Sequence, residues 1–375
     1  FNMTEILQKI QESNKNLFVG LAGPGTGKST AFKDIINADE FKGKKILILS
    51  FINKLVNDLL KDLENFKNVE VLTLHSFALR ELCKQTKSKV NLDPNLDHVI
   101  SEDLSLIRDE NINYQVKFYE NDLSKEDENF YKSRKEFYES DEKLYSFNSI
   151  VYAINKIFAD KSKIPSYDLI LIDEFQDFNK LEYELIKLLN KKSKVILVGD
   201  DNQSLYDFKN AKPKQIRDLY KDDSVEKFSI DYCYRCTEVI VNATDSFVKT
   251  AKKKGYLKDN LDKLFLYPNH DEKHKSKHEL SQKYSKIDFI SSVSGDLLIY
   301  KLAQNIKEYI GKDRKKVLII VPSYLKQSIF DGLIEKGFNI VDFELFSDEE
   351  CNHIKHKDLI ETLKVLTKRK TDNLA

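Results

Sequence analysis

The sequence predicts an α/β protein: a domain built on a parallel sheet with a phosphate-binding loop, a mainly helical insertion, and part of a second α/β domain. Short, near-continuous apolar runs alternate with helical periods, which is typical of parallel strands covered by helices on both faces. A glycine-rich loop that ends in Gly-Lys-Ser follows the first apolar run. The chain has 375 residues, of which 41% are hydrophobic, so it is long enough for two or three domains with cores of their own.

Five apolar runs, each bounded by polar turns, are the predicted strands of the first sheet. They span residues 17–21, 45–50, 69–74, 167–172 and 195–198. Helical periods separate several of these runs, as at residues 54–63 and 181–189. This order predicts an open sheet in which helices connect successive strands.

Residues 83–150 interrupt this alternation of strands and helices and are predicted to form a mostly helical, loop-rich insertion. Residues 101–145 carry 13 acidic and 7 basic side chains, a net charge of −6. An acidic segment of this kind is a poor candidate for binding phosphates. The first domain is therefore predicted to comprise residues 1–82 and 151–224, with the accessory insertion between them.

A second α/β pattern follows, and residues 225–375 are predicted to form part of another domain. Its predicted strands cover residues 287–291 and 317–321, and its predicted helices cover residues 295–310 and 324–336. Between residues 251 and 290 there are 10 lysines and 6 acidic residues. A solvated loop is the favoured interpretation of this basic segment, ahead of a phosphate-binding surface.

Charge and cysteine content limit the class of protein. The 61 basic and 61 acidic side chains cancel, so any nucleic acid must be bound by a local patch rather than by overall attraction. Four scattered cysteines are too few for a disulfide framework and fit a reducing cytoplasm. No apolar run approaches 18 residues, and residues 1–16 lack the features of a signal peptide. We therefore expect a cytoplasmic protein with no membrane partner.

The strongest motif is the loop Ala-Gly-Pro-Gly-Thr-Gly-Lys-Ser-Thr, which lies between a predicted strand and a predicted helix. Its small residues let backbone N–H groups close around phosphate oxygens, and the N-terminus of the helix adds partial positive charge. Lys28 is expected to reach the β- and γ-phosphates of ATP, and the Ser29 hydroxyl to ligate Mg²⁺. The predicted ATP-binding residues of the loop are Ala22, Gly23, Pro24, Gly25, Thr26, Gly27, Lys28, Ser29 and Thr30.

Two further strands end in side chains suited to nucleotide chemistry. Asp173 and Glu174 follow the run at residues 167–172, at the sheet edge where the phosphate loop is expected. Asp173 is predicted to ligate Mg²⁺, and Glu174 to act as the general base. Gln203 follows the run at residues 195–198, and its amide is suited to hydrogen-bond both a γ-phosphate oxygen and the attacking water. A plain solvated turn is the alternative for each segment.

The order of these motifs resembles that of superfamily 1 DNA helicases of the UvrD/Rep/PcrA type. Ser-Phe-Ile-Asn-Lys at residues 50–54 is similar to motif Ia of that family, and Thr-Leu-His-Ser-Phe-Ala-Leu-Arg at residues 73–80 to motif Ib. Residues 173–177, 199–206 and 232–236 are similar to motif II, motif III and the start of motif IV. The resemblance implies P-loop NTPase domains of the RecA-like type. The first domain would be motor domain 1A, the insertion would be 1B-like, and the last segment would be part of motor domain 2A.

The resemblance also implies roles for residues at matching positions. Arg235 would contact the γ-phosphate, and Tyr234 would stack on the adenine. Gln8 matches the adenine-reading glutamine of the family, although a glutamine on a surface helix fits equally well. The implied contacts with single-stranded DNA are Phe51, Asn53, His75, Tyr206, Phe208 and Lys209. Aromatic stacking suits sequence-tolerant binding, and ordinary core packing is the alternative for the three aromatic residues.

Several positions depart from the family pattern. Thr30 stands where an arginine usually stacks on the adenine, and Lys209 replaces an arginine whose planar fork lysine lacks. The Cys233-x-x-Cys236 pair lacks a second pair of ligands, which argues against zinc. Motifs V and VI are not found in the last part of the chain. We therefore expect a fragment of a longer helicase or a shortened relative, with a protein partner or a further C-terminal region supplying those motifs.

The sequence thus predicts an ATP hydrolase: an ATP-dependent DNA helicase that uses Mg²⁺ and moves along single-stranded DNA or partial duplexes. The family resemblance implies travel from 3′ to 5′. The alternative is a non-translocating ATP-binding switch or a regulatory subunit of a DNA-processing complex, which the missing motifs favour if the chain ends at Ala375. A P-loop kinase or transporter ATPase is a third interpretation, and the context of Gln203 and Tyr206 weakens it.

Overall fold

The computed structural model describes most of the first 340 residues and divides the chain into two compact units. The described residues are 3–50, 66–140, 142–203, 213–268, 272–283, 286–287, 292, 294–310, 317–321, 323–338 and 340. Unit 1 comprises residues 1–285 and unit 2 comprises residues 286–375.

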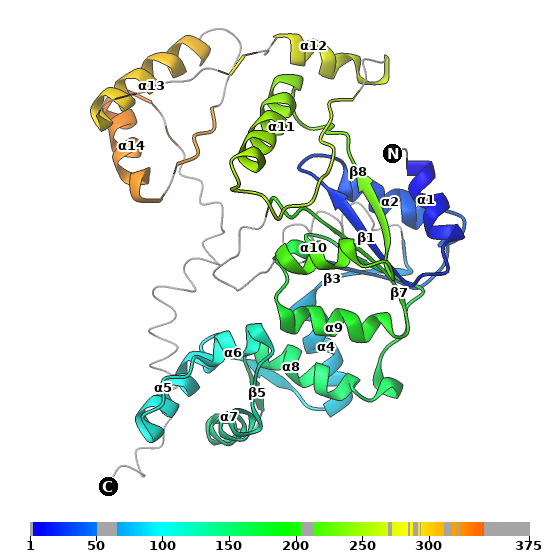
Figure 1. Ribbon diagram of the computed structural model, residues 1–375. Helices are drawn as coiled ribbons and strands as arrows, with labels where there is room; N and C mark the ends of the chain where they lie inside the picture. The colour runs from blue at the N-terminus through cyan, green and yellow to red at the C-terminus, as the bar shows by residue number, and fades with distance from the viewer. Residues whose placement is uncertain are drawn as a thin grey trace. The chain divides into compact units, whose positions relative to one another are not determined.

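Unit 1 contains a six-stranded parallel sheet with the order β3-β2-β6-β7-β1-β8 (Figure 1). Its strands are β1 (Leu17–Ala22), β2 (Ile46–Ser50), β3 (Val69–Thr73), β6 (Leu169–Ile172), β7 (Lys194–Gly199) and β8 (Glu226–Ile230). In register, Val19 of β1 lies opposite Leu197 of β7 and Lys227 of β8. Five of the strands coincide with the predicted apolar runs, which confirms the parallel α/β sheet.

Strand β8 contradicts the predicted domain boundary, which places every residue after 224 in a second domain. In the structure β8 pairs in parallel with β1 and forms an edge of the first sheet. Gly20 explains the close packing there, since a Cβ at this position would lie 2.4 Å from the ring of Phe228. The first sheet therefore extends beyond the predicted boundary.

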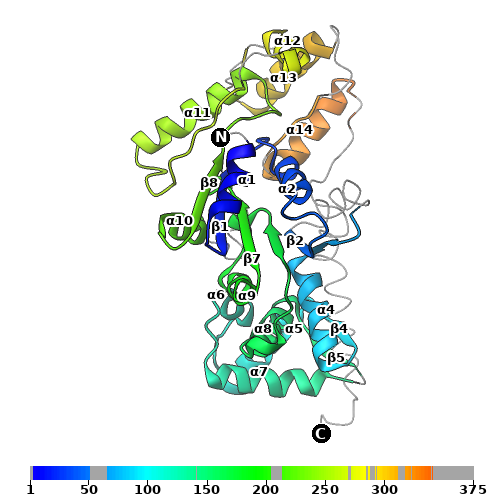
Figure 2. The same cartoon turned by 90° about the vertical axis from the view of Figure 1, so that its right-hand side faces the viewer.

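Helices cover both faces of the sheet, as the continuous apolar strands predict. Alternate side chains of each strand enter separate cores: Phe18 packs on one face and Val19 on the other. The Phe18 face is covered by α1 (Met3–Glu12) and α2 (Lys28–Asn37). The opposite face is covered by α4 (Leu74–Thr86), α8 (Phe147–Phe158), α9 (Lys180–Asn190) and α10 (Pro213–Lys221) (Figure 2). The predicted helix at residues 181–189 is confirmed by α9, and the one at residues 54–63 lies outside the described residues.

A reciprocal cap fixes the start of α9, just after the predicted acidic motif. The N–H of Glu182 donates to the side chain of Asn179 at 3.0 Å, and the carboxylate of Glu182 accepts from the N–H of Asn179 at 2.9 Å. Such a capping box satisfies two backbone N–H groups that the helix itself leaves without partners. The chain therefore turns from the sheet edge into α9 in a defined direction.

The insertion is mainly helical, as predicted. It contains α5 (Leu96–Arg108), α6 (Tyr114–Glu120), α7 (Lys125–Tyr138) and two short parallel strands, β4 (Val90–Leu92) and β5 (Lys143–Tyr145). Aromatic side chains fill its interior, with the ring of Tyr131 5.1 Å from that of Tyr114 and 5.0 Å from that of Phe118. The buried carboxylate of Asp97 accepts from the hydroxyl of Tyr131 at 2.6 Å and from the amide of Asn148 at 2.8 Å. Burial raises the pKa of Asp97.

The rest of unit 1 follows β8. It contains α11 (Glu238–Lys253), a short 3₁₀ turn (Glu272–His274) and α12 (Lys275–Lys283). The chain between α11 and this turn runs back beside the end of β8, where Tyr232 and Leu266 form a parallel bridge. This return brings residues far along the chain back to the sheet edge that carries the phosphate loop.

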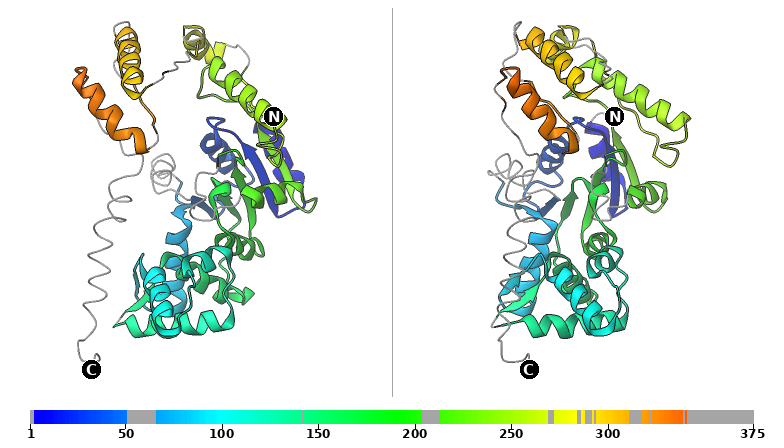
Figure 3. Two further views of the ribbon diagram at one scale, coloured as in Figure 1. Left: turned by 60° about the vertical axis from the view of Figure 1, so that its left-hand side comes forward. Right: turned by 90° about the vertical axis from the view of Figure 1, so that its left-hand side faces the viewer.

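Unit 2 contains a pair of packed helices, α13 (Gly295–Ile310) and α14 (Ser323–Glu335) (Figure 3). They coincide with the two predicted helices. The helices approach closely at Gly332, where a Cβ would lie 2.7 Å from the side chain of Ile299. Residues 317–321, which are predicted to form a strand, have no regular secondary structure in the described part of unit 2. Of the predicted strand at residues 287–291, only residue 287 is described, so that prediction falls almost wholly outside the described residues.

Among the helices of the described residues, none is both long and apolar enough to span a membrane.

Candidate functional site

The phosphate loop joins β1 to α2 and has the backbone shape that its sequence predicts. Gly25 and Gly27 adopt left-handed conformations, with φ of 70° and 90°. The hydroxyl of Thr26 donates to the carbonyl of Gly23 at 2.9 Å and braces the turn. Gly27 caps α2 and has no side chain to occupy the N–H groups of the first helical turn. Those groups, together with the positive end of the helix, fit the binding of an anion such as a phosphate group.

Lys28 lies between the two predicted carboxylates. Its Nζ is 2.7 Å from Oε1 of Glu174 and 3.9 Å from Oδ1 of Asp173. Asp173 is almost fully buried, and its pKa is raised to about 6 by burial and then by the negative charge of Glu174, while Lys28 acts in the opposite direction. The lysine, the metal-ligand candidate and the general-base candidate therefore lie at one edge of the sheet.

The backbone at Glu174 is held in an unusual conformation. Its φ of 51° is left-handed, which is uncommon for a residue other than glycine and costs on the order of 1 kcal/mol. Two hydrogen bonds hold the residue there. The N–H of Glu174 donates to Oδ1 of Asp173 at 2.9 Å, and Nε2 of Gln176 donates to Oε2 of Glu174 at 2.8 Å. The amide of Gln176 thus holds Oε2 of the Glu174 carboxylate, and Lys28 holds Oε1.

Gln176 and Asp200 connect this carboxylate to the next strand, and the sequence analysis gives neither a role. The buried Gln176 accepts from the N–H of Asp200 through Oε1, at 2.9 Å. Asp200 follows β7, and its Oδ2 accepts from Nε2 of Gln203 at 2.7 Å. The predicted catalytic residues Glu174 and Gln203 are therefore joined through two intervening residues, by the side chain of Gln176 and by the N–H and carboxylate of Asp200.

Arg235 and Tyr234 also reach the phosphate loop, from the segment after β8. The N–H of Tyr234 donates to the carbonyl of Gly25 at 2.9 Å, and a Cβ on Gly25 would lie 2.5 Å from Cβ of Arg235. The thiol of Cys233 donates to the carbonyl of Pro24 at 3.3 Å. The side chain of Tyr234 is half-exposed, with its ring 5.0 Å from that of His274.

Other predicted site residues lie elsewhere. Gln8 is on the exposed side of α1, where its amide donates to the carboxylate of Glu12 at 2.7 Å. This position fits the alternative that Gln8 is an ordinary glutamine on a surface helix. Nε2 of His75 is 3.5 Å from a carboxylate oxygen of Glu182. Within the described ranges, no three His, Cys, Asp or Glu side chains gather to hold a metal ion. The predicted DNA contacts that fall outside the described residues are Phe51, Asn53, Tyr206, Phe208 and Lys209.

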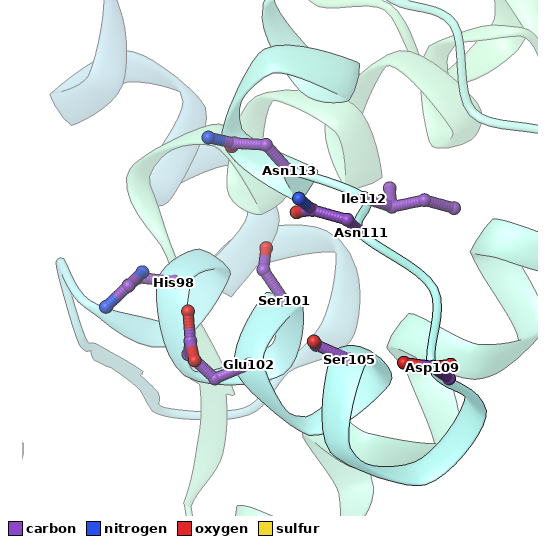
Figure 4. Close-up of a pocket in the computed structure, with 8 residues that line it drawn as sticks. All are labelled: His98, Ser101, Glu102, Ser105, Asp109, Asn111, Ile112 and Asn113. Atoms are coloured by element: carbon purple, nitrogen blue, oxygen red, sulfur yellow. The ribbon is translucent and has the colours of Figure 1, made fainter.

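A polar hollow of about 550 Å³ lies in the insertion, away from these motifs in the sequence (Figure 4). It is lined by residues of α5 and of the loop that follows: His98, Ser101, Glu102, Ser105, Asp109, Asn111, Ile112 and Asn113. The hydroxyl of Ser101 donates to the carbonyl of Asp97 and accepts from the N–H of Tyr114, so it is already engaged within the fold. None of the predicted site residues lines this hollow.

A protein-family model matches the part of the chain that contains the phosphate loop, the two carboxylates and Gln203. The model of the UvrD/REP helicase N-terminal domain matches residues 3–140 and 108–224, which together exceed half of the chain. The chain belongs to the UvrD/REP helicase family. This confirms the resemblance on which the sequence analysis relies. Tyr234 and Arg235 lie beyond the matched residues.

Similar UvrD/REP proteins occur in several bacteria. A probable DNA helicase II homolog of Mycoplasma genitalium is 27% identical over 324 residues, covering 72% of this chain and 46% of the relative. An ATP-dependent DNA helicase Rep of Buchnera aphidicola is 26% identical over 329 residues, covering 75% of this chain and 49% of the relative. A DNA helicase II of Haemophilus influenzae is 40% identical over 80 residues, covering 21% of this chain and 11% of the relative. The chain spans about half the length of the first two of these curated relatives.

Proposed function

We propose that this chain binds and hydrolyses ATP as the motor portion of a UvrD-type DNA helicase. The observation that carries the proposal is the position of Lys28, 2.7 Å from Glu174 and 3.9 Å from Asp173. A phosphate-loop lysine beside two carboxylates at the carboxyl ends of parallel strands is the arrangement that ATP hydrolysis requires. The names of the relatives, DNA helicase II and Rep, support the same class of activity.

The donor set fits Mg²⁺ and ATP. Hydroxyl and carboxylate oxygens are the protein ligands that Mg²⁺ prefers, and Ser29 and Asp173 would hold the ion. When bound, Mg²⁺ would neutralise charge on the phosphate oxygens. The loop from Ala22 to Thr30 would hold the phosphates. A Cβ at Gly25 would fill space that the loop leaves next to Arg235, which supports a role for this glycine beyond the turn itself.

Glu174 is the proposed general base, and Lys28 controls its availability. In the structure, the ammonium of Lys28 pairs with the carboxylate of Glu174. Phosphate oxygens compete for that ammonium, so binding of the nucleotide would release one carboxylate oxygen while Gln176 keeps the other in place. The freed oxygen can accept a proton from the attacking water. Gln203 would orient this water, and Arg235 would stabilise negative charge that develops on the γ-phosphate.

Single-stranded or partially duplex DNA is the proposed substrate. We assign its contacts to Phe51, Asn53, His75, Tyr206, Phe208 and Lys209, on the strength of their motif positions. Phe208→Ala should weaken binding of an oligothymidine by about 1–3 kcal/mol, since each stacked base contributes that amount. An unchanged dissociation constant in a fluorescence anisotropy titration would remove Phe208 from the DNA track. Travel from 3′ to 5′ is proposed on the family resemblance.

We also propose a division of the chain into functional parts. Residues 1–82 and 151–224, extended by strand β8, would form motor domain 1A, residues 83–150 the accessory insertion, and the chain after β8 part of motor domain 2A. A protein partner or a further C-terminal region would supply motifs V and VI. Strand β8 would then be a structural part of 1A, because it pairs with β1.

ATP turnover with and without oligothymidine tests the proposal. We expect hydrolysis that single-stranded DNA stimulates and that Lys28→Ala abolishes, because the phosphates lose their mobile cation. Lys42→Ala is a matched control, since Lys42 is an exposed lysine shortly after α2. Nucleotide binding without DNA-stimulated turnover would instead favour the non-translocating switch. Equal turnover in wild type and Lys28→Ala would contradict the site itself.

A further inference from the structure

Lys263 reaches the nucleotide site from a part of the chain in which the sequence shows no motif. It lies on the segment between α11 and the 3₁₀ turn, which two backbone hydrogen bonds hold beside the end of β8. The N–H of Leu266 donates to the carbonyl of Asp231, and the N–H of Cys233 donates to the carbonyl of Leu266, each at 2.8 Å. These bonds fix the backbone from which the side chain of Lys263 enters the site.

The ammonium of Lys263 is buried against two carboxylates at the end of β7. Only 10% of its side chain is exposed. It forms an ion pair with Asp200, and its Nζ lies 3.4 Å from Oδ1 of Asp201. Asp201 has a second cation, since Nε of Arg217 lies 3.0 Å from its Oδ2. For Asp200, the cation in the described structure is Lys263.

Asp200 occupies a central place among the predicted catalytic groups. Its Oδ2 holds the amide of Gln203, and its N–H holds the amide of Gln176 that supports Glu174. Asp200 is 1% exposed, so its ionised carboxylate needs a compensating charge. Without one, the carboxyl group would take up a proton or the turn after β7 would rearrange. Either change would alter the hydrogen bond that orients Gln203.

We propose that Lys263 is a positioning residue for ATP recognition and hydrolysis, which acts by holding the carboxylate of Asp200 so that Asp200 holds the amide of Gln203. The inference rests on the proposed function, because it assigns Gln203 to the γ-phosphate. Lys263 need not contact the nucleotide in this arrangement. It sets the geometry of the residue that distinguishes ATP from ADP.

The electrostatic surroundings of Lys263 contain both positive and negative groups. Burial, and then the positive charge of Lys28, lower the pKa of Lys263 to about 7. The ammonium nevertheless pairs with the carboxylate of Asp200 and lies 3.4 Å from that of Asp201. The partner of this buried lysine is the same carboxylate that accepts from the amide of Gln203.

Discrimination between ADP and ATPγS tests the inference without depending on turnover. The dissociation constants of both nucleotides are measured by fluorescence titration for the wild-type chain and for Lys263→Met. We expect the affinity for ADP to change less than about twofold. The ratio of the dissociation constant for ADP to that for ATPγS should fall on the order of tenfold. This is the effect expected from the loss of one hydrogen bond to a charged group. Gln203→Ala should lower the ratio equally, and adding Lys263→Met to it should lower the ratio no further.

Two further variants separate positioning from folding. Lys252→Met removes another partly buried lysine, whose Nζ anchors the same segment through the carbonyls of Asn260 and Leu261, and it should leave the ratio unchanged. In Asp200→Asn/Lys263→Met the buried charge is removed together with its partner, and the new amide oxygen still accepts from Gln203. This double variant should recover the midpoint of thermal unfolding of the wild type. It should also recover most of the fall in the ratio of the ADP and ATPγS dissociation constants that Lys263→Met causes.

The outcomes distinguish the inference from the function on which it rests. If the wild-type chain binds neither nucleotide, the proposed function fails. If Gln203→Ala lowers the ratio but Lys263→Met does not, the function stands and the positioning role of Lys263 is wrong. Equal losses of affinity for ADP and ATPγS in Lys263→Met would also overturn it, because they would indicate a direct or general contribution to nucleotide binding. An equal fall in the ratio of the two dissociation constants in Lys252→Met would also overturn it, because it would show that Lys263 only anchors its segment.

Discussion

Gln176→Leu should both destabilise the protein and slow ATP hydrolysis. Gln176 is 2% exposed, and its amide makes two hydrogen bonds, to Oε2 of Glu174 at 2.8 Å and from the N–H of Asp200 at 2.9 Å. Leucine has a similar volume but cannot make either bond. The substitution therefore removes the support of the proposed base and leaves a buried N–H without its partner.

The expected loss of stability follows from these two bonds. A hydrogen bond to an ionised carboxylate contributes about 1.5–3 kcal/mol, and leaving a buried N–H unsatisfied costs about 1–3 kcal/mol. The apolar surface that leucine buries offsets part of this, so we expect the free energy of unfolding to fall by roughly 2–4 kcal/mol. ATP turnover should fall as well, while affinity for ATP changes little, because Gln176 contacts Glu174 and not the phosphate loop.

Urea denaturation followed by circular dichroism measures the loss of stability, and Gln215→Leu is the matched control. The amide of Gln215 makes one long hydrogen bond to the carbonyl of Phe178, at 3.4 Å, and its Oε1 is buried without a partner in the described structure. The same substitution should therefore be nearly neutral there. Equal losses in the two variants, or a Gln176→Leu variant with full stability and turnover, would refute the reasoning.

Two further predictions concern the loop and the metal. Gly25→Ala should lower the affinity for ATP, because φ of Gly25 is 70° and a Cβ would lie 2.5 Å from Cβ of Arg235. Gly43→Ala is the control, since φ of Gly43 is 76° and a Cβ there would meet nothing within 4 Å. This control should lower stability by about 1 kcal/mol but leave nucleotide titrations unchanged. The pKa of Asp173 is raised to about 6, so at constant Mg²⁺ the affinity for Mg²⁺-ATP should weaken as pH falls through about 6, since the protonated carboxyl cannot ligate metal. In Asp173→Asn this pH dependence should disappear, and a profile identical to wild type would assign it to another group.

The local sequence was sufficient to predict the features that short segments encode. The strands around the phosphate loop are continuous apolar runs, and the loop needs only its own glycines and the helix that follows. Helices α13 and α14 could likewise be predicted from their own periodicity. These features depend on neighbours in the sequence, so a pattern within about ten residues is enough to indicate them.

Features that depend on distant partners could not be predicted in the same way. The edge strand β8 alternates between half-buried and buried residues, which is a weaker signal than the continuous runs. Residues 317–321 form an apolar run typical of a strand, but the run itself does not specify a partner strand, which pairing requires. Gln176 stands inside a recognised motif, yet its partner Asp200 comes from another strand. Lys263 has no motif at all and reaches the site only because its segment returns along β8.

The most direct test of the account is the behaviour of Glu174→Gln, which keeps the size of the side chain and removes its ability to accept a proton. ATP affinity is measured by fluorescence titration, and hydrolysis by single-turnover assay with oligothymidine present. We predict an affinity within a few-fold of wild type and hydrolysis slower by about 10²–10⁴-fold, the usual contribution of a general base. Hydrolysis at the wild-type rate would contradict the assignment of Glu174 and, with it, the proposed chemistry of the site.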